Sequence, residues 1–181
     1  MIAKSPLKFQ DFKASLHICR AELHHINPVM ALIRAVTDDM AAHNLDQWND
    51  NYPTQQILEQ DIRQGNLYLL FDESYLCGQV VLNDRQDDEY KTIPWGYHAD
   101  KVMVVHRLCV HPAQRGRGYA HKLMDFAEHY ASANGYSCIR LDAYTANSAA
   151  INLYETRNYT KAGEVRFPGR KFVFNCYEKM L

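Results

Sequence analysis

The run KVMVVHRLCV, residues 101–110, restricts the possible folds of this chain more than any other feature. It is apolar on both faces around His106 and Arg107, which is typical of a central strand in a sheet that is covered on both sides. A turn with two glycines follows at 115–118. Residues 120–131 then place apolar side chains along one stripe of a helix, which Asn134 and Gly135 are expected to end. A buried strand that leads through a glycine turn into an amphipathic helix predicts a layered α/β domain.

The chain before this strand changes from helical to strand periodicity. Asn27 is expected to cap a first helix with Pro28 at its first position, and Thr54 is expected to cap a second helix. Two strands separated by a short acidic turn then indicate a hairpin. The expected ranges are 1–14 for an extension, 15–20 for a strand, 27–44 and 54–65 for the helices, and 66–71 and 75–82 for the hairpin.

A polar and aromatic loop, 83–100, precedes the central strand, and shorter elements follow the amphipathic helix. These are a strand over 138–143, a helix over 147–157, and two strands over 159–166 and 172–180. The order βααβββαβαββ shows no repeat and no linker. It predicts one α/β domain over residues 1–181, with a mixed central sheet of about seven strands and helices on both faces.

The composition limits the classes of function. A chain of 181 residues with 47% hydrophobic residues is large enough for one globular core. The net charge of −1 gives no basic field for a nucleic acid. No apolar run is long enough to span a bilayer, and the N-terminus lacks the apolar region of a secretory signal. We therefore expect a cytoplasmic protein without a nucleic-acid or membrane partner.

Cysteine and histidine usage favours structural roles over a metal site. No pair of cysteines has the C-x-x-C spacing, so buried free thiols in a reducing cytoplasm are expected. His17, His24 and His25 cluster in the sequence, but no zinc-ligand spacing accompanies them, and we expect no metal. The five cysteines are Cys19, Cys77, Cys109, Cys138 and Cys176.

The glycine turn has the chemistry of an anion site. A helix N-terminus leaves its first N–H groups unpaired and carries a partial positive charge. Gly116 and Gly118 lack the Cβ atoms that would hold a ligand away, and Arg115 and Arg117 can add charge-assisted hydrogen bonds. No residue before the helix is a good acceptor cap. The alternative interpretation is that water satisfies these amides and that the arginines are surface charge.

Two common phosphate motifs do not fit this turn. The P-loop pattern G-x-x-x-x-G-K-[ST] is absent. The dinucleotide fingerprint G-x-G-x-x-G begins at Gly116 and Gly118, but His121 occupies the position that needs a small residue for packing of the helix on the strand. If the turn binds a phosphate group, its ligand is therefore expected to belong to another class than the nucleotides that these two motifs bind.

Two motifs carry a resemblance to a known family. Arg115-x-x-Gly118-x-Ala120 matches R/Q-x-x-G-x-G/A, and the stretch LCVHPAQRGRGYAHKLM around it resembles the fourth strand, pyrophosphate loop and third helix of the GNAT superfamily of acetyl-CoA-dependent N-acetyltransferases. Asn147-x-x-Ala150-x-x-Leu153-Tyr154-Glu155 is similar to the next signature of that superfamily. Both motifs lie on the expected elements and in the expected order, from about residue 15 to the C-terminus.

The resemblance implies the superfamily's fold and direct transfer of an acetyl group from acetyl-CoA, a co-substrate, to an amine. Strand main-chain groups would hold the pantetheine arm and the thioester carbonyl, the turn amides the pyrophosphate, and Asn147 the pantetheine side. Tyr154 would lie near the sulfur as a general acid, although one aromatic side chain on a core face is the alternative. The implied cofactor-binding residues are Leu108, Cys109, Val110, Arg115, Gly116, Arg117, Gly118, Tyr119, Ala120, Asn147, Ala150 and Tyr154.

The sequence departs from the superfamily pattern in two places. Asn158-Tyr159 stands where Gly-Phe is usual, and Asn tolerates the left-handed conformation that ends a helix. The fourth strand lacks the Glu that serves many members as a base. His106 is the one neutral-pH base on that strand, so it is the candidate base. A core histidine, with water as the base, is an equal alternative.

The acceptor is left open by the sequence. Acidic residues at 87–89 accompany several aromatic residues, a combination that suits a cationic amine. A solvated acidic loop with aromatics packed beneath it explains the same pattern. A polyamine, aminoglycoside, amino acid or protein N-terminus all fit. The sequence leaves open whether the protein forms a homodimer. A non-catalytic acyl-CoA-binding or protein-interaction module is the alternative function. The aromatic and imidazole side chains concerned are Trp48, Tyr52, Tyr90, Trp95, Tyr97 and His98.

Overall fold

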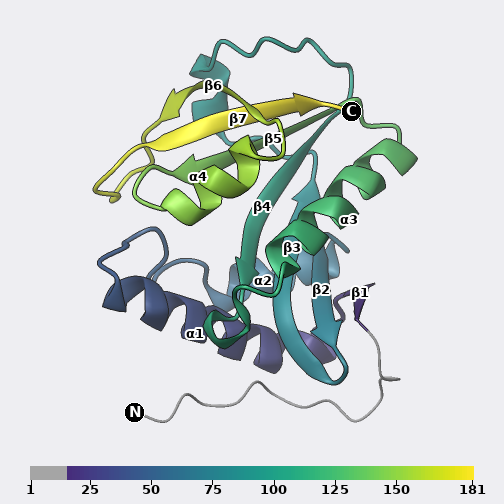
Figure 1. Ribbon diagram of the computed structural model, residues 1–181, viewed down its shortest axis with the longest axis vertical. Helices are drawn as coiled ribbons and strands as arrows, with labels where there is room; N and C mark the ends of the chain where they lie inside the picture. Colours follow the sequence, from purple (N-terminus) through teal and green to yellow (C-terminus); the bar gives the residue numbers. More distant parts are fainter. Residues whose placement is uncertain (1–15) are drawn as a thin grey trace. The chain divides into compact units, whose positions relative to one another are not determined.

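The computed structural model describes residues 16–181, and Figure 1 shows the course of the chain. Seven strands form one mixed sheet in the order β1-β2-β3-β4-β5-β7-β6, which confirms the predicted α/β class. The expected extension, 1–14, lies outside the described residues. The strands are β1 (His17–Arg20), β2 (Leu67–Asp72), β3 (Tyr75–Asn83), β4 (Val102–Val110), β5 (Cys138–Tyr144), β6 (Thr160–Val165) and β7 (Phe174–Met180). The helices are η1 (Leu23–His25), α1 (Ile26–Ala42), α2 (Gln55–Arg63), η2 (Asp88–Thr92), η3 (Pro112–Gln114), α3 (Tyr119–Ala133) and α4 (Ser148–Glu155).

The sheet contains both antiparallel and parallel strand pairs, and β4 takes part in a parallel pair. Strands β1, β2 and β3 pair in antiparallel fashion, and the predicted β2–β3 hairpin is confirmed. Strand β4 pairs in parallel with β5, but only over Val102–Val104. Strand β7 pairs in antiparallel fashion with both β5 and β6. The second half of β4 therefore extends beyond its ladder with β5.

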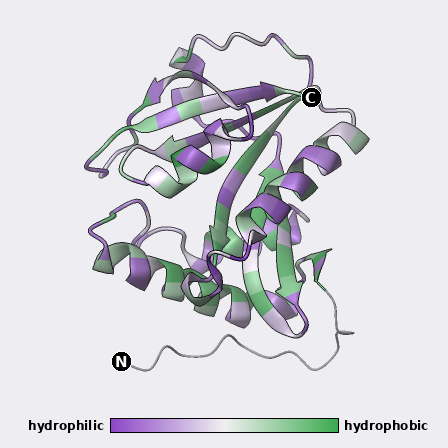
Figure 2. Ribbon diagram, in the orientation of Figure 1, coloured by the Kyte–Doolittle hydropathy of each residue, from purple (hydrophilic) through white to green (hydrophobic). Residues whose placement is uncertain are grey.

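The described chain divides into two compact units, each built from separate segments. The first contains the chain up to Asn44, then Trp48–Val81 and Arg107–Met124. Its strands β2 and β3 are largely hydrophobic along their length, whereas α3 alternates between hydrophilic and hydrophobic residues (Figure 2). Helix α1 buries Val29, Leu32 and Val36 at helical spacing, which gives this unit its apolar layer.

Gly78 on β3 sets a close approach to β4 within the first unit. A Cβ atom built at this glycine would lie 2.6 Å from the main-chain oxygen of Cys109 and 3.2 Å from a side-chain carbon of Leu123 on α3. Since the nearest atom is backbone, no larger residue fits without moving β4. The main-chain N–H of His111 also donates to the Cys77 oxygen at 2.8 Å. Together these contacts fix the second half of β4 against β3.

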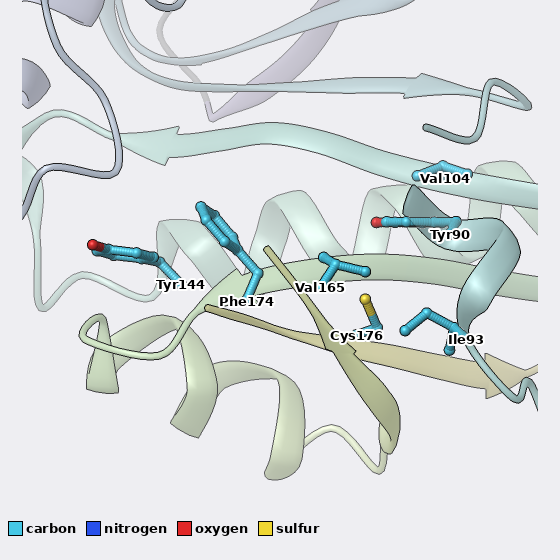
Figure 3. Close-up of a cluster of buried hydrophobic side chains, with 7 residues drawn as sticks. All are labelled: Tyr90, Ile93, Val104, Tyr144, Val165, Phe174 and Cys176. Atoms are coloured by element: carbon cyan, nitrogen blue, oxygen red, sulfur yellow. The ribbon is translucent and has the colours of Figure 1, made fainter. Parts of the chain in front are cut away.

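The second unit contains Leu45–Gln47, Leu82–His106 and Asp125–Leu181. Its core combines side chains of β4, β5, β6 and β7 with two residues of the loop over 83–100 (Figure 3). Burial of these side chains anchors the loop on the sheet. The cluster consists of Tyr90, Ile93, Val104, Tyr144, Val165, Phe174 and Cys176.

One helix start differs from the prediction. Asn27 was expected to cap the first helix, but α1 begins at Ile26 and its N-cap residue is His25. The expectation is wrong because a short 3₁₀ helix precedes α1, in which His25 Nδ1 accepts from the Glu22 N–H at 3.0 Å. Pro28 then falls within the first turn, where its missing N–H costs nothing. The cap at Thr54 is confirmed, since its hydroxyl accepts from the Ile57 N–H at 3.4 Å.

The described residues also bear on the membrane, metal and thiol expectations. Over 16–181, no helix has the length and apolar character needed to cross a bilayer. In the same range, no group of three or more His, Cys, Asp or Glu side chains is arranged to hold a metal ion. The five cysteines are free thiols, buried except for the half-buried Cys19.

Candidate active site

The turn that leads into α3 presents a row of unused main-chain donors. Gly116 and Gly118 have φ angles of 77° and 78°, so glycine is required here by the left-handed backbone. A Cβ atom at either position would meet no protein atom within 4 Å, so packing within the protein does not demand glycine. From Gly116 to Ala120, no main-chain N–H donates a hydrogen bond to a residue in 16–181. These donors at a helix N-terminus form a cradle for an anion.

The Arg115 side chain of this turn already has a partner within the first unit. The Arg115 guanidinium lies 2.6 Å from an Asp39 carboxylate oxygen on α1, and half of the arginine side chain is exposed. Tyr119, the first residue of α3, donates its hydroxyl to the Asp72 carboxylate at the end of β2. The turn is therefore tied to α1 and to the β2–β3 hairpin. Arg115 was not recognised as a partner of α1 because no sequence pattern links it to Asp39.

The end of β4 directs alternate main-chain groups to different sides. The His111 N–H points to Cys77 on β3, and the Cys109 oxygen faces Gly78 on the same strand. Because successive residues of a strand alternate, the N–H and C=O groups of Leu108 and Val110 point away from β3. Of the three implied strand residues, Leu108 and Val110 thus offer free-edge main-chain groups. Cys109 directs its main chain into the sheet instead, and burial raises the pKa of its thiol to about 12.

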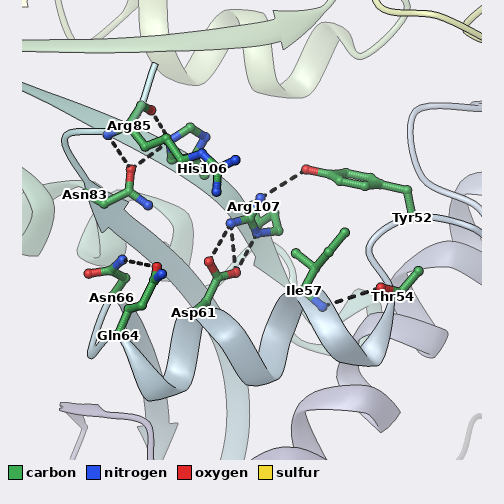
Figure 4. A network of polar contacts seen from close by, with 10 residues as sticks. All are labelled: Tyr52, Thr54, Ile57, Asp61, Gln64, Asn66, Asn83, Arg85, His106 and Arg107. Atoms are coloured by element: carbon green, nitrogen blue, oxygen red, sulfur yellow. Dashed lines mark hydrogen bonds and ion pairs between the residues drawn. The ribbon is translucent and has the colours of Figure 1, made fainter. Parts of the chain in front are cut away.

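Arg107 interrupts the regular backbone of β4. Its φ is 48°, a left-handed value that is costly for a residue with a Cβ atom. Its guanidinium donates two hydrogen bonds to Asp61 of α2, at 2.8 and 2.9 Å, and a third to the Tyr52 hydroxyl at 3.1 Å (Figure 4). In the sequence, Arg107 stands out only as a polar residue in an apolar strand. That polarity was the available signal, but its partner Asp61 could not be identified from spacing.

In the second unit, Tyr154 lies in the last turn of α4. Its side chain is 6% exposed, and the rings of Tyr159 and Tyr177 are 5.9 and 6.1 Å away. Burial, with a contribution from Asp142, raises the pKa of the Tyr154 hydroxyl well above its ordinary value. This hydroxyl donates no hydrogen bond to any residue in the described range. Tyr154 therefore holds its proton at neutral pH and has an unused donor.

Asn147 and Ala150 begin the same helix. The Asn147 side-chain oxygen accepts from the Ala150 N–H at 3.2 Å, so Asn147 is the N-cap of α4. Its amide nitrogen donates to the Gln47 side chain at 3.1 Å. At the other end of α4, Asn158 has a φ of 63°, which confirms its expected left-handed conformation. Asn in place of Gly thus ends this helix without a change of geometry.

His106, the candidate base, already uses one ring nitrogen. Its Nε2 lies 3.1 Å from the Asn83 side-chain oxygen and 3.0 Å from the Arg85 main-chain oxygen (Figure 4). Because a carbonyl oxygen only accepts, these contacts place the proton on Nε2. The neutral ring then carries its lone electron pair on Nδ1. Any role as a base must use that atom.

The aromatic residues of the loop at 83–100 are largely structural. Tyr90 is 2% exposed and donates its hydroxyl to Asp142 at 2.8 Å. The Trp95 indole donates to the Tyr90 main-chain oxygen at 3.0 Å, and the Arg140 guanidinium lies 4.2 Å from the centre of its ring. The interpretation of aromatics packed beneath a polar loop is therefore confirmed for these two residues. Tyr97 is half-buried and His98 is exposed.

The implied site residues fall into two groups, one in each unit. Residues 108–110 and 115–120 belong to the first unit and lie on consecutive elements, the end of β4 and the start of α3. His106, Asn147, Ala150 and Tyr154 belong to the second unit. The donor-rich cradle is thus one group, and the protonated hydroxyl of Tyr154 belongs to the other.

A seven-stranded mixed sheet in this order, with a glycine turn between its fourth strand and third helix, defines the α/β fold class of N-acetyltransferases. The family model described as "Acetyltransferase (GNAT) family" matches residues 32–159, more than half of the chain. The chain belongs to that family.

Two curated relatives share part of the sequence. Streptothricin acetyltransferase of Escherichia coli is 29% identical over 96 residues, which are 53% of this chain and 48% of that protein. The match therefore spans less than half of that relative. Acetyltransferase Atu2258 of Agrobacterium fabrum is 28% identical over 132 residues, which are 73% of this chain and 78% of that protein.

Solved structures share the fold at low sequence identity. A GNAT-family acetyltransferase of Streptococcus agalactiae superposes with a TM-score of 0.80 at 22% identity, over 92% of this chain and 95% of that one. The protein yncA of Salmonella typhimurium, solved with its cofactor acetyl-CoA, gives 0.66 at 16% identity, over 92% and 94%. The NatC complex bound to Gag peptide and CoA gives 0.65 at 15% identity, over 92% and 99%.

Proposed function

We propose that this protein transfers the acetyl group of acetyl-CoA directly to an amine in a ternary complex. The observation that carries the proposal is the row of unused N–H groups from Gly116 to Ala120, held open by two left-handed glycines at the start of α3. Such a cradle matches the charge and shape of a pyrophosphate. Family membership and the acetyl-CoA bound to yncA support the same ligand.

The first unit would bind the cofactor mostly through its main chain. The turn amides would take the pyrophosphate, and Arg117, which no carboxylate within residues 16–181 holds, would add charge. Leu108 and Val110, whose main-chain groups point away from β3, would pair with the pantetheine arm and the thioester carbonyl. The Arg115 guanidinium shares its charge with Asp39, which reduces what it can add to an anion. The resemblance implies that Asn147 and Ala150, at the start of α4, also bind the cofactor.

Acetyl transfer requires a proton donor to the leaving sulfur and an acceptor for the proton that the amine loses. The neutral amine nitrogen bonds to the acetyl carbon, the carbon–sulfur bond breaks, and the sulfur leaves as a thiolate that a hydroxyl can protonate. Tyr154 suits this role, since its raised pKa keeps the hydroxyl protonated and no described residue occupies it. The proton lost by the amine goes to water or to Nδ1 of His106.

The acceptor class is proposed as a primary amine of a small molecule or a peptide, with cationic character. Two relatives illustrate the two kinds, since one is a streptothricin acetyltransferase and the NatC structure holds a peptide. The acidic residues Asp87, Asp88 and Glu89 would favour a cation over the acetylated, neutral product. Four buried free thiols are in keeping with a reducing, cytoplasmic location.

A panel of amines tests this function. The purified protein is mixed with acetyl-CoA and a polyamine, an aminoglycoside, a free amino acid or a peptide with a free N-terminus, and thiol release is recorded. We expect release with at least one amine. The absence of a Glu on β4 favours the second candidate, a non-catalytic acyl-CoA-binding module. Tight acetyl-CoA binding without release for any amine supports that module and contradicts the enzyme.

A further inference from the structure

Arg107 has an unusual backbone conformation for its place in the fold. Among the described non-glycine residues, Asn44, Glu73 and Asn158 also have positive φ angles, but each lies just after a helix or in the β2–β3 turn. Arg107 alone lies inside a strand. A left-handed conformation costs an L-residue about 1–2 kcal/mol, so the surrounding structure must hold it.

The contacts that keep Arg107 in this conformation are made by its own side chain. Its guanidinium makes a bidentate pair with Asp61, and the two side chains are only 12% and 8% exposed. The Tyr52 hydroxyl accepts from the remaining arm of the fork. A planar fork bound on two sides fixes the position of Cα107 more firmly than a lysine could. A buried ion pair stabilises a fold less than apolar packing of the same volume would. We therefore ascribe to this pair the role of fixing the backbone geometry at Arg107.

The left-handed residue Arg107 lies between two parts of β4 that pair with different strands. Before it, Val102–Val104 is laddered to β5. After it, the hydrogen bond from His111 to Cys77 fixes the strand against β3, so that Leu108 and Val110 face away from β3. Leu108 directly follows Arg107, and a rotation of the peptide at Arg107 would re-aim the Leu108 N–H group. Arg107 therefore controls the direction of the first free-edge donor.

We propose that Arg107, Asp61 and Tyr52 are positioning residues for acetyl transfer, which hold β4 so that the Leu108 N–H points at the thioester carbonyl oxygen as it gains negative charge. The role rests on the proposed function. None of the three side chains needs to touch the substrate. Removal of one donor to an oxyanion costs about 10²–10³-fold in rate, and misdirection of a donor costs less. Loss of the contacts between Arg107, Asp61 and Tyr52 should therefore lower kcat by about 10- to 100-fold, with little change in acetyl-CoA affinity.

The Arg107→Gly variant distinguishes the effect of backbone strain from the effect of the side-chain contacts. Glycine adopts the same φ without cost, so the backbone strain is relieved while the anchor is lost. Glu73→Gly is the matched control, because it relieves a φ of 54° in the β2–β3 turn, which lies outside β4. The measurements are the kcat of the folded fraction with the best amine of the panel, and the Kd of acetyl-CoA by calorimetry. We expect a loss of kcat only in Arg107→Gly, with Kd within about threefold of the original.

A graded pair of variants covers the case in which Arg107→Gly does not fold. Tyr52→Phe removes one hydrogen bond and keeps the ion pair, and Asp61→Asn keeps the shape and removes the charge. We expect kcat to fall in the order Tyr52→Phe, then Asp61→Asn, with Kd again little changed. A merely structural network would lower the free energy of unfolding and leave kcat of the folded protein intact, and that result overturns the role. An original protein without turnover for any amine contradicts the proposed function itself.

Discussion

Tyr154 offers the sharpest test at the scale of single residues. Tyr154→Phe removes one hydroxyl and keeps the ring, so the fold should persist. General-acid assistance is typically worth about 10²–10⁴-fold, and a thiolate is already a fair leaving group. We expect a loss of about 10- to 100-fold in kcat with the KM for acetyl-CoA little changed. Tyr159→Phe, which removes the same atom from the neighbouring ring, is the control and should keep full kcat. Full kcat in Tyr154→Phe, with chemistry rate-limiting, would make Tyr154 structural.

Cys109 should not act as a nucleophile. Burial raises the pKa of its thiol to about 12, so at pH 8 the unreactive protonated form predominates. We expect Cys109→Ala to keep most of its turnover, and no acetylated enzyme to accumulate in the original protein. Mass spectrometry after incubation with acetyl-CoA alone reads this directly. An acetyl adduct on Cys109 would point to a covalent intermediate in place of direct transfer.

At the scale of elements, the turn before α3 should govern cofactor binding. Gly118→Ala places a Cβ atom on a left-handed backbone, and Gly118→Glu adds a negative charge facing the pyrophosphate. Gly135→Ala is a matched control, because Gly135 has a φ of 75° and equally open space at the other end of α3. We expect all three to lose a similar free energy of unfolding, about 1–2 kcal/mol. Only Gly118→Glu should weaken acetyl-CoA binding by more than about tenfold in calorimetry. Unchanged affinity in a folded Gly118→Glu variant would remove the pyrophosphate from this turn.

The pair between α1 and the turn should compete with the cofactor. Asp39 holds the Arg115 guanidinium at 2.6 Å, so Asp39→Asn frees a cation beside the anion cradle. A partly exposed pair is worth about 0–1 kcal/mol, so we expect acetyl-CoA to bind up to about fivefold more tightly at low salt. Asp38→Asn removes the same charge from the adjacent, exposed position and should have less effect. Equal gains in the two variants would mean that only net charge matters.

Local features of these elements were predictable, and long-range ones were not. The cap at Thr54 and the left-handed Asn158 follow from residue type, because short polar side chains bond to nearby main chain or tolerate αL. The left-handed Arg107 contradicts its residue type and depends on Asp61, which lies on another element. For the same reason, the sequence indicated Arg115 as a donor to a bound anion, but could not indicate that its guanidinium is paired with Asp39. Tertiary contacts decided both.

At the scale of the whole molecule, the two units should unfold together. Strands and helices are shared, since β4 and α3 each contribute residues to both units. The two tryptophans report separately, because Trp48 belongs to the first unit and Trp95 to the second. In Trp95→Phe and in Trp48→Phe, the fluorescence of the remaining tryptophan should follow the same urea curve as far-UV circular dichroism. Separate midpoints for the two probes in either variant would show that one unit opens first.

The interleaving of the units also constrains how such a chain can change over generations. Because each unit is assembled from three separate segments, no single crossover between two genes exchanges one unit and leaves the other unmixed. A recombinant joined anywhere along the chain inherits a mixed first unit, a mixed second unit, or both. Exchange of halves, the route by which modular proteins gain new specificities, is therefore poorly suited to this architecture. New acceptors are more readily reached by substitutions and by loop insertions, one position at a time, around an unbroken β4 and α3.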